Sequence, residues 1–475
     1  MRPEVREAVR SVDVRGWKKV EVEFGSDMLE IAVPPSCETL SMKDANVLAD
    51  PARALEKGLA APIGSPPLEA ILRAKNKPPA ELAVAVSVSD ITRPVPYKGG
   101  SGLLAPLLGR LEKAGIRRPN ITFVVGTGMH RPSTAEEKIE MFGESVVRDY
   151  RVVDHDCEDL GSLVDIGRTA TGTEVYVNGA FHRADVKIVT GLVESHFMAG
   201  VSGGRKGVCP ALVDKRTIEK FHSPAFLESP LADNLILEGN PCHAEALEVA
   251  RTVGVDFLVN VTLDRDMRPT GVFAGHLEEA HLEAVLFMKD YTAIPLSREY
   301  DIVLTHGGYA GRNHYQSAKA ACTAVPAVKK GGAIILAADN RDPEPVGSPE
   351  YRYCLGRFKE RGGIEGYLKM VLDPGWTFTK DQWEPEVWGR AVRKVGEEGL
   401  IYCSPQIGAG DYALLPGLPG LDFLGAEEGL IGRDAAQAMV QNALLFVVHR
   451  LREREGALPS LAVLREGPYG VPVAI

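Results

Sequence analysis

Residues 81–130 read ELAVAVSVSDITRPVPYKGGSGLLAPLLGRLEKAGIRRPNITFVVGTGMH and decide the fold. The uncharged runs AVAVSV and ITFVV predict two buried strands, and GLLAPLLGRLEKAG between them has the apolar spacing of an amphipathic helix. A strand, a helix and a second strand in this order are typical of a βαβ unit, in which the strands are parallel and helices cover the sheet. The segment therefore predicts an α/β fold.

The same alternation continues along the chain and then starts a second time. Strand and helix patterns follow one another up to LEEAHLEAVLFMKDY, which ends at residue 291. AIPLSREY at residues 293–300 breaks this helix, and DIVLTHGG, a helical stretch over about residues 315–328 and GGAIILAAD open a second series. We therefore predict two domains, residues 1–292 and 293–475, each with a mostly parallel sheet flanked by helices. We expect the active site in the interdomain cleft or at the carboxyl ends of the strands.

A β-hairpin is expected near the start of the chain. KKVEVEFGSDMLEIAV, from Lys18 to Val33, alternates polar and apolar residues on both sides of Gly25-Ser26-Asp27. This pattern is typical of two short strands with one buried face joined by a tight turn. We expect the hairpin to lie at the edge of the first domain.

The composition is that of an ordinary globular protein. The 475 residues are 45% hydrophobic and 25% charged, which argues against disorder and against a disulfide scaffold. The formal net charge of −10 provides no general attraction for nucleic acid or anionic lipid. The charged start MRPEVREAVRSVDV and the lack of a long apolar run predict a cytoplasmic protein with no membrane segment. The seven cysteines form no CxxC pair, so we expect reduced, mostly buried thiols.

Candidate functional residues gather in four segments that follow predicted strands. These segments are SDITRP at 89–94, GTGMHRP at 126–132, ESHFMAGVSGGRKG at 194–207 with His222 after it, and GGYAGRNHYQSAK at 307–319. They combine the histidine, arginine and lysine side chains that a small anionic ligand requires. Each segment alone also fits a plain structural role, as a turn with a surface arginine, a loop histidine or a solvated helix face. We expect His155 in VVDHDCED to be structural.

Several familiar catalytic motifs are absent from the sequence. GVSGGRKG resembles a phosphate loop but lacks the GxxxxGK[ST] spacing, because Lys206 is followed by Gly207. No HExxH, HxH or CxxC motif supports a zinc hydrolase. What the glycine-rich segment does offer is a set of backbone amides able to hold an anion beside a lysine.

Taken together and in order, the motifs resemble the lactate racemase family that uses a nickel pincer nucleotide. The resemblance rests on DxTRP, TGxHRP, HFxAGxSGGRK, a later histidine, YQSxK and DQW, and it extends from about residue 89 to residue 383. Ala310-Gly311-Arg312 departs from the family, which usually has a proline and an acidic residue there. Donor groups on Arg312 or His314 would then alter the choice of substrate, so the identity of the 2-hydroxy acid stays open.

The resemblance implies a role for each matching residue. Lys206 would form the thioamide that tethers the cofactor, His222 would be the protein ligand to nickel, and His130 and His196 would be the paired acid/base residues. The substrate would be bound by Arg93, Gln316 and Lys319. The cofactor and the pocket would be supported by Asp90, Tyr315 and Trp383. Residues 1–292 would then carry the cofactor attachment and acid/base groups, and residues 293–475 would close over the site.

The resemblance also implies the reaction, and the residues leave two alternatives to it. The family inverts C2 of lactate or a related 2-hydroxycarboxylate by hydride transfer to and from the nickel pincer nucleotide through a 2-keto acid. Proteins that synthesise the cofactor would be partners, together with the small-molecule substrate. A nicotinamide-dependent 2-hydroxyacid oxidoreductase would share the βαβ rhythm, although no GxGxxG follows a strand. A non-catalytic protein that binds an organic acid or the cofactor would share the cationic residues.

Overall fold

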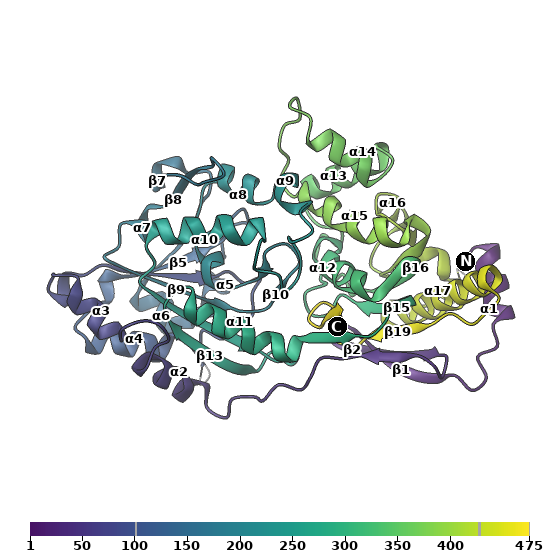
Figure 1. Cartoon of the computed structure of the whole chain (residues 1–475), viewed down its shortest axis with the longest axis horizontal. Coiled ribbons are helices and arrows are strands. Elements are labelled where there is room, and N and C mark those ends of the chain that lie inside the picture. The colour runs from purple at the N-terminus through teal and green to yellow at the C-terminus, as the bar shows by residue number, and fades with distance from the viewer. Residues whose placement is uncertain (100–101, 426–428, 475) are drawn as a thin grey trace. The chain divides into compact units, whose positions relative to one another are not determined.

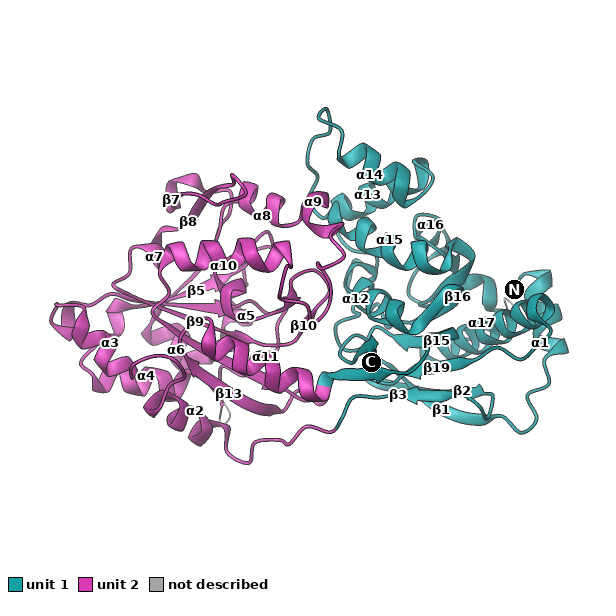
Figure 2. Cartoon of the chain, viewed as in Figure 1, with its two compact units in different colours: residues 1–43, 292–475 teal, residues 44–291 magenta. Residues whose placement is uncertain are grey.

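The structure is a computed structural model and describes residues 1–99, 102–425 and 429–474 (Figure 1). The chain divides into two compact units (Figure 2). Unit 2 is residues 44–291, and unit 1 combines residues 1–43 with residues 292–475. The two α/β series lie in different units, and residues 1–43 belong to the unit of the second series.

Unit 2 is built on a six-stranded sheet with the order β13-β12-β9-β4-β5-β6. Its strands are β4 Val84–Ser89, β5 Ile121–Gly126, β6 Arg151–Asp154, β9 Val186–Leu192, β12 Phe257–Leu263 and β13 Pro269–Gly275. All neighbouring strands are parallel except β12 and β13, which pair antiparallel. The uncharged strands predicted at AVAVSV and ITFVV are β4 and β5, and both are almost fully buried, as strands covered on two faces should be.

The helices of unit 2 lie on both sides of this sheet (Figure 1). They are α2 Pro51–Ala60, α3 Leu68–Ala74, α4 Leu104–Lys113, α5 Ala135–Phe142, α6 Glu144–Asp149, α7 Gly179–His182, α8 Lys215–Phe221, α9 Pro224–Leu227, α10 Pro241–Val253 and α11 Glu279–Thr292. Leucines of α2 and α4, among them Leu55 and Leu107, pack with Val86 and Phe123 in one core cluster. Burial of such side chains is the main driving force for this layer, at about 1.5–3 kcal/mol for each.

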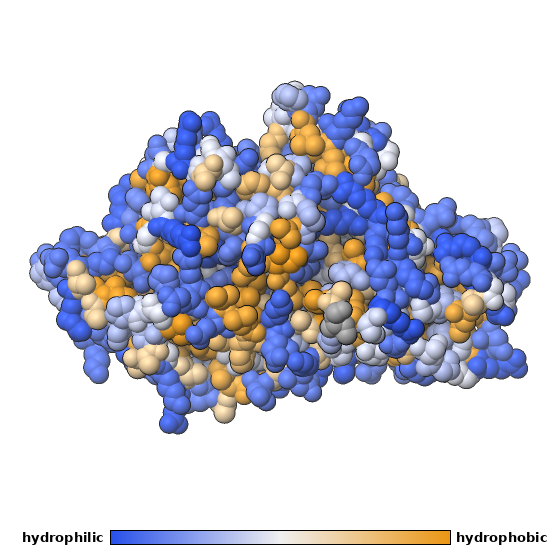
Figure 3. Space-filling model, in the orientation of Figure 1, coloured by the Kyte–Doolittle hydropathy of each residue, from blue (hydrophilic) through white to orange (hydrophobic). Residues whose placement is uncertain are grey.

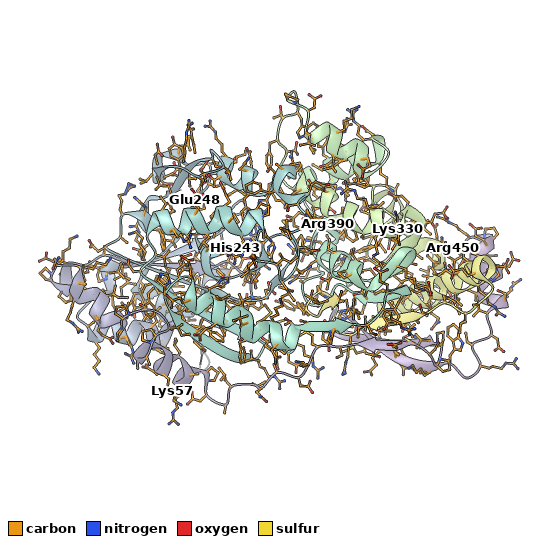
Figure 4. The ribbon with its side chains drawn as sticks, viewed as in Figure 1. Lys57, His243, Glu248, Lys330, Arg390 and Arg450 are labelled. Atoms are coloured by element: carbon orange, nitrogen blue, oxygen red, sulfur yellow. The ribbon has the colours of Figure 1, made fainter. Side chains whose placement is uncertain are left out.

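Two small hairpins complete unit 2. They are formed by β7 Leu163–Arg168 with β8 Glu174–Asn178 and by β10 Ser195–His196 with β11 Gly200–Val201. The first hairpin is held to α10, which carries His243 and Glu248 (Figure 4), because Glu248 accepts a hydrogen bond of 2.7 Å from the amide of Ala170. The second hairpin carries His196 and belongs to the candidate site.

Unit 1 has its own six-stranded sheet with the order β18-β17-β16-β15-β19-β3, in which every pair is parallel. Its strands are β3 Glu38–Leu40, β15 Tyr300–His306, β16 Val328–Ala337, β17 Leu400–Cys403, β18 Leu418–Pro419 and β19 Leu461–Leu464, and β14 Ala293–Leu296 pairs separately with β20 Val471–Ala474. The helices are α1 Pro3–Ser11, α12 His314–Ala324, α13 Pro349–Glu360, α14 Ile364–Val371, α15 Trp383–Val395, α16 Ala409–Tyr412 and α17 Gly432–Glu455.

The predicted hairpin forms. It does not lie at the edge of the domain that follows it in sequence, as expected, but belongs to unit 1. It consists of β1 Lys18–Phe24 and β2 Asp27–Val33. The amides of Glu30 and Ala32 donate to side-chain oxygens of Gln437 and Gln441 on α17, and the apolar face of the hairpin packs into the core that α17 shares with β15 and β16. This partner lies about 400 residues later, so local sequence carries no sign of it.

The structure also agrees with the sequence on cysteines. All seven are free and buried, as expected for reduced thiols.

Among the described helices, none combines the length and apolar character that crossing a bilayer requires. On the face drawn in Figure 3, hydrophilic residues are interspersed with apolar ones.

Candidate active site

The ends of β4 and β5 bring Asp90 and His130 together. Ser89 pairs with Gly126, so the loops that follow the two parallel strands leave the sheet at the same edge. His130 Nδ1 lies 2.6 Å from Asp90 Oδ2, and Thr92 Oγ1 donates to Asp90 Oδ1 at 2.6 Å. Burial raises the pKa of the Asp90 carboxyl, but the hydrogen bonds from His130 and Thr92 outweigh burial and leave the pKa below its usual value.

This pairing fixes the tautomer of His130. An ionised carboxylate only accepts hydrogen bonds, so the Nδ1 atom of His130 carries the proton and donates it to Asp90. The lone pair of the ring is then on Nε2. The His130 side chain is 50% exposed, whereas that of Asp90 is 8% exposed, so the carboxylate anchors a ring that can meet a ligand. This is the arrangement of a histidine oriented as a proton acceptor.

Arg93 is joined to the loop that follows β9. Its Nη1 donates to Glu194 Oε1 at 3.0 Å, and both side chains are partly exposed. One Nη is thereby engaged, and a guanidinium has five N–H donors in a planar fork. Glu194 also connects to the glycine-rich loop, since its amide donates to Ser202 Oγ at 3.0 Å.

His196 lies in the tight hairpin formed by β10 and β11. Its partner in the ladder is Gly200, which has φ +76° and whose position would bring a Cβ atom to 2.0 Å from the carbonyl oxygen of Ile236. The amides of Met198 and Ala199 both point at His196 Nδ1, at 3.2 and 3.3 Å. Nδ1 is therefore an acceptor, and the proton of the neutral ring is on Nε2. His196 and His130 thus have opposite tautomers.

The glycine-rich loop that follows is held from several sides. Ser202 Oγ donates to the carbonyl of Leu192 at 2.7 Å, and the Gly204 amide donates to Asn260 Oδ1 at 3.0 Å. The Arg205 side chain, 1% exposed, donates through Nη2 to the carbonyl of Ala199 at 2.7 Å. The Arg205 bond joins the residue before Lys206 to Ala199 in the hairpin that carries His196, and the other two bonds hold the loop to β9 and β12.

Lys206 and His222 pack against the same phenyl ring. Lys206 Nζ lies 4.8 Å from the centroid of the Phe221 ring, and the His222 ring lies 4.8 Å from that centroid. Burial, together with the charges of Arg205 and Arg93, lowers the pKa of Lys206 to about 7. A large share of this amine is therefore uncharged near neutral pH, which is the state in which an amine is a nucleophile.

His222 is held as a neutral imidazole. It follows directly after α8, and its Nδ1 donates to the carbonyl oxygen of Ile218 at 2.9 Å. Burial, together with the charges of Lys206 and His130, lowers the pKa of His222 to about 3. With the proton on Nδ1, the Nε2 lone pair is the ring's ligand atom for a metal. In the described part of the chain, no three His, Cys, Asp or Glu side chains cluster as a metal site.

The remaining predicted residues form a separate group in unit 1, at the start of α12. The Asn313 side chain caps this helix by accepting from the amide of Gln316 at 2.9 Å. Gln316 and Lys319 are three residues apart, and Lys319 is 7% exposed. Trp383 Nε1 donates to the Tyr315 hydroxyl at 3.0 Å, which joins the YQSxK and DQW motifs.

The structure clarifies the two residues whose donor groups were expected to alter the choice of substrate. Arg312 pairs with Asp342 at 2.9 Å. His314 is fully buried, and its ring stacks on Trp388 with 4.3 Å between the ring centroids. Its Nδ1 atom forms a hydrogen bond of 2.8 Å with the Tyr351 hydroxyl. Burial lowers the pKa of His314 to about 3, so this ring supplies no positive charge. Of the two, Arg312 alone retains a cationic group.

Sequence reasoning missed two contacts and was right about one histidine. Glu194 binds Arg93, a contact that the sequence does not indicate. Tyr469, beyond the last motif, places its ring 5.5 Å from Lys319 Nζ. A lone tyrosine in the loop REGPYG has no sequence signal that could have singled it out. His155 is structural as expected, since it is 2% exposed and bonds to the Val213 carbonyl at 2.9 Å.

Comparison with known proteins identifies relatives of this chain. Residues 24–233 match the family model of the lactate racemase N-terminal domain. The chain is 38% identical to the lactate racemase of Lactiplantibacillus plantarum over 341 residues, 71% of this chain and 77% of that protein. It is 32% identical to the lactate racemase of Thermoanaerobacterium thermosaccharolyticum over 341 residues, 71% and 76% of the two chains. The solved structure of the lactate racemase apoprotein from the latter organism superposes with a TM-score of 0.78 at 25% identity, covering 96% of this chain and 100% of that one.

Proposed function

The chain belongs to the lactate racemase family and is an isomerase of the racemase class, and we propose that it inverts C2 of lactate or a related 2-hydroxycarboxylate with a nickel pincer nucleotide as cofactor. The observation that carries the cofactor assignment is that Lys206 and His222 pack on one phenyl ring. A nucleophilic amine and a neutral imidazole ligand are the two protein groups that a tethered nickel cofactor requires.

The residues present fit this cofactor. Lys206 would hold it through a thioamide, and its lowered pKa favours the uncharged amine from which that bond forms. His222 Nε2 would be the protein ligand to its nickel. When bound, the group supplies an acceptor for the hydride at C2 of the substrate. Cofactor-synthesis proteins are the partners that this proposal implies.

His130 and His196 are assigned as the acid/base pair. His130 Nε2 holds a lone pair and takes the hydroxyl proton of one enantiomer as C2 becomes a planar carbonyl. His196 is assigned to the other enantiomer; because its Nδ1 accepts from the amides of Met198 and Ala199, Nε2 is the ring atom that exchanges a proton with the substrate. Inversion needs a proton acceptor for the hydroxyl of each enantiomer, because the hydroxyl loses its proton when C2 becomes a planar carbonyl and regains one when the hydride returns.

The anchoring of the substrate is assigned to cationic and amide groups. Arg93 can bind a carboxylate with the donors of its fork that Glu194 leaves available. Gln316 and Lys319 on α12 would hold the substrate or its developing charge, and Asp90, Tyr315 and Trp383 support the catalytic and binding groups. A carboxylate that stays anchored lets C2 invert without loss of the keto acid.

The test is to produce the chain together with cofactor-synthesis proteins and to measure racemisation, intact mass and nickel content. We expect interconversion of L- and D-lactate, an added covalent mass and nickel stoichiometric with the chain. Lys206→Ala should abolish the added mass, whereas the control Lys57→Ala, an exposed lysine on α2 (Figure 4), should keep it.

The histidines are tested separately from loading. His130→Ala and His196→Ala should each abolish racemisation while nickel and the covalent mass stay. Full activity in either variant would contradict its acid/base role. Turnover that depends on nicotinamide without nickel would favour the oxidoreductase, and ligand binding without turnover would favour the carrier.

A further inference from the structure

Lys319 is a lysine whose surroundings include an aromatic face. It projects from α12 and is 7% exposed, and its Nζ lies 5.5 Å from the centroid of the Tyr469 ring. An ammonium at this distance from a ring centroid is attracted by the negative face of the ring, and the attraction is larger when water is largely excluded. Tyr469 therefore helps to stabilise a charge that burial opposes.

Tyr469 is itself fixed from two directions. Its hydroxyl accepts a hydrogen bond of 3.2 Å from the amide of Ala310, in the loop between β15 and α12. Its own amide donates to the carbonyl of Glu466 at 3.1 Å. Glu466, 3% exposed, accepts in turn from Ser41 Oγ and the Met42 amide, each at 2.8 Å. The ring is thus anchored to the loop that leads into α12.

Gly308 allows this close approach. It has φ +60°, and a Cβ atom at its position would lie 2.9 Å from Tyr469 Cε2 and 3.1 Å from the hydroxyl oxygen. A side chain there would displace the ring or the loop, and the left-handed backbone disfavours one in any case. The loop 307–312 and the C-terminal loop 465–470 are therefore fitted to each other around Tyr469.

We propose that Tyr469 is a positioning residue that holds the Lys319 ammonium in place for the substrate carboxylate and so sets the affinity for the 2-hydroxy acid. This inference rests on the proposed role of Lys319 in substrate binding. The ring face attracts the ammonium through its quadrupole and does not itself accept an N–H hydrogen bond from it. A rigid aromatic side chain does this at small entropic cost, because it has only two rotatable bonds.

The experiment compares kinetic constants of the cofactor-loaded protein for L-lactate, with propionate as a competitive inhibitor. Propionate keeps the carboxylate but has no hydroxyl to oxidise, so its inhibition constant reports carboxylate binding alone. Tyr469→Leu removes the ring and should raise KM and the propionate inhibition constant by about three- to thirtyfold, with a smaller change in kcat. Tyr469→Phe keeps the ring and should stay within about threefold of the unaltered protein.

Two further variants make the result specific. In a Lys319→Met background, Tyr469→Leu should add little, because the two residues act through one interaction. Tyr353→Leu is the matched control, since Tyr353 on α13 is 47% exposed and its ring lies 5.2 Å from the Arg357 guanidinium. This variant removes an equivalent contact at the surface and should leave KM unchanged. If Tyr469→Leu does not fold, Tyr469→Met replaces the ring with a flexible apolar chain and carries the same comparison.

The outcomes separate this inference from the proposed function. An unchanged KM in folded Tyr469→Leu, or an undiminished effect of that substitution in the Lys319→Met background, would overturn the positioning role and leave the racemase assignment intact. An unchanged KM in Lys319→Met itself would overturn the role of Lys319 and this inference with it.

Discussion

Replacing Asp90 with Asn tests the orientation of His130. The Asp90 carboxylate is the group that holds the proton on His130 Nδ1 and the lone pair on Nε2. An amide has both a donor and an acceptor, so the ring can turn or take the other tautomer. We expect racemisation to fall sharply while the covalent cofactor and nickel remain.

The size of the effect follows from the geometry. The contact is 2.6 Å long and Asp90 is 6% exposed, so a buried, charge-assisted hydrogen bond is lost. Such bonds contribute about 1.5–3 kcal/mol, or roughly 10- to 150-fold in rate. Wrong-tautomer effects in serine protease triads reach about 10⁴-fold. We therefore expect kcat/KM to fall by about 10²- to 10⁴-fold.

The assay is polarimetry from each pure enantiomer, with nickel content measured on the same samples. Because the equilibrium constant between enantiomers is one, kcat/KM has to fall equally in both directions. Asp264→Asn is the matched control, since Asp264 is 9% exposed and binds Arg268 through both Nε and Nη2, outside the candidate site. A folded, nickel-loaded Asp90→Asn protein within threefold of the unaltered rate would refute the assigned role of Asp90.

Three further substitutions test the loop, an ion pair and the hairpin. Gly204→Ala would place a Cβ atom 2.6 Å from His281 Cγ at φ +55°, so we expect reduced nickel loading and about 1–3 kcal/mol lower stability; unaltered loading and stability would contradict this. Hydrogen bonding to Arg131 lowers the pKa of Glu137 to about 2. The ionised carboxylate therefore adds a small stabilisation of the folded protein above pH 4.5, and this stabilisation is lost as the pH falls through about 2. In Glu137→Gln, the difference in unfolding free energy between pH 6 and acid pH should shrink by this amount. Ile31→Ala should lower the unfolding free energy by about 2–5 kcal/mol in a denaturant titration, because Ile31 is fully buried in the core of α17, and a neutral result would contradict the placement of the hairpin in unit 1.

The fold was predictable wherever the signal was local. The runs that became β4 and β5 are uncharged, those that became β15 and β16 are mostly apolar, and helical patterns separate them; strands of this kind have few alternatives to a covered parallel sheet. The hairpin of residues 18–33 was predictable for the same reason, since its turn and alternation lie within one short segment. Its docking on α17 was not, because the glutamines that bind its backbone lie about 400 residues later.

The candidate site was predictable as a set of residues but not as an arrangement. Asp90 and His130 each followed a strand, yet only the register of β4 and β5 shows that they meet. The tautomer of His196 depends on where two backbone amides point, which no residue type encodes. His314 was expected to add donor capacity beside the YQSxK motif, but the helix turns it into the core against Trp388. Tyr469 had no motif around it.

The central claim is that the chain inverts C2 by moving the hydrogen as a hydride that returns to the same carbon. The direct measurement is the fate of deuterium when L-lactate labelled at C2 is racemised by the loaded protein in ordinary water. We predict that the D-lactate formed retains the label at C2, because the hydroxyl proton exchanges through His130 and His196 while the C2 hydrogen does not exchange with solvent. Loss of the label to water at the rate of inversion would contradict the claim and would point to removal of the C2 hydrogen as a proton.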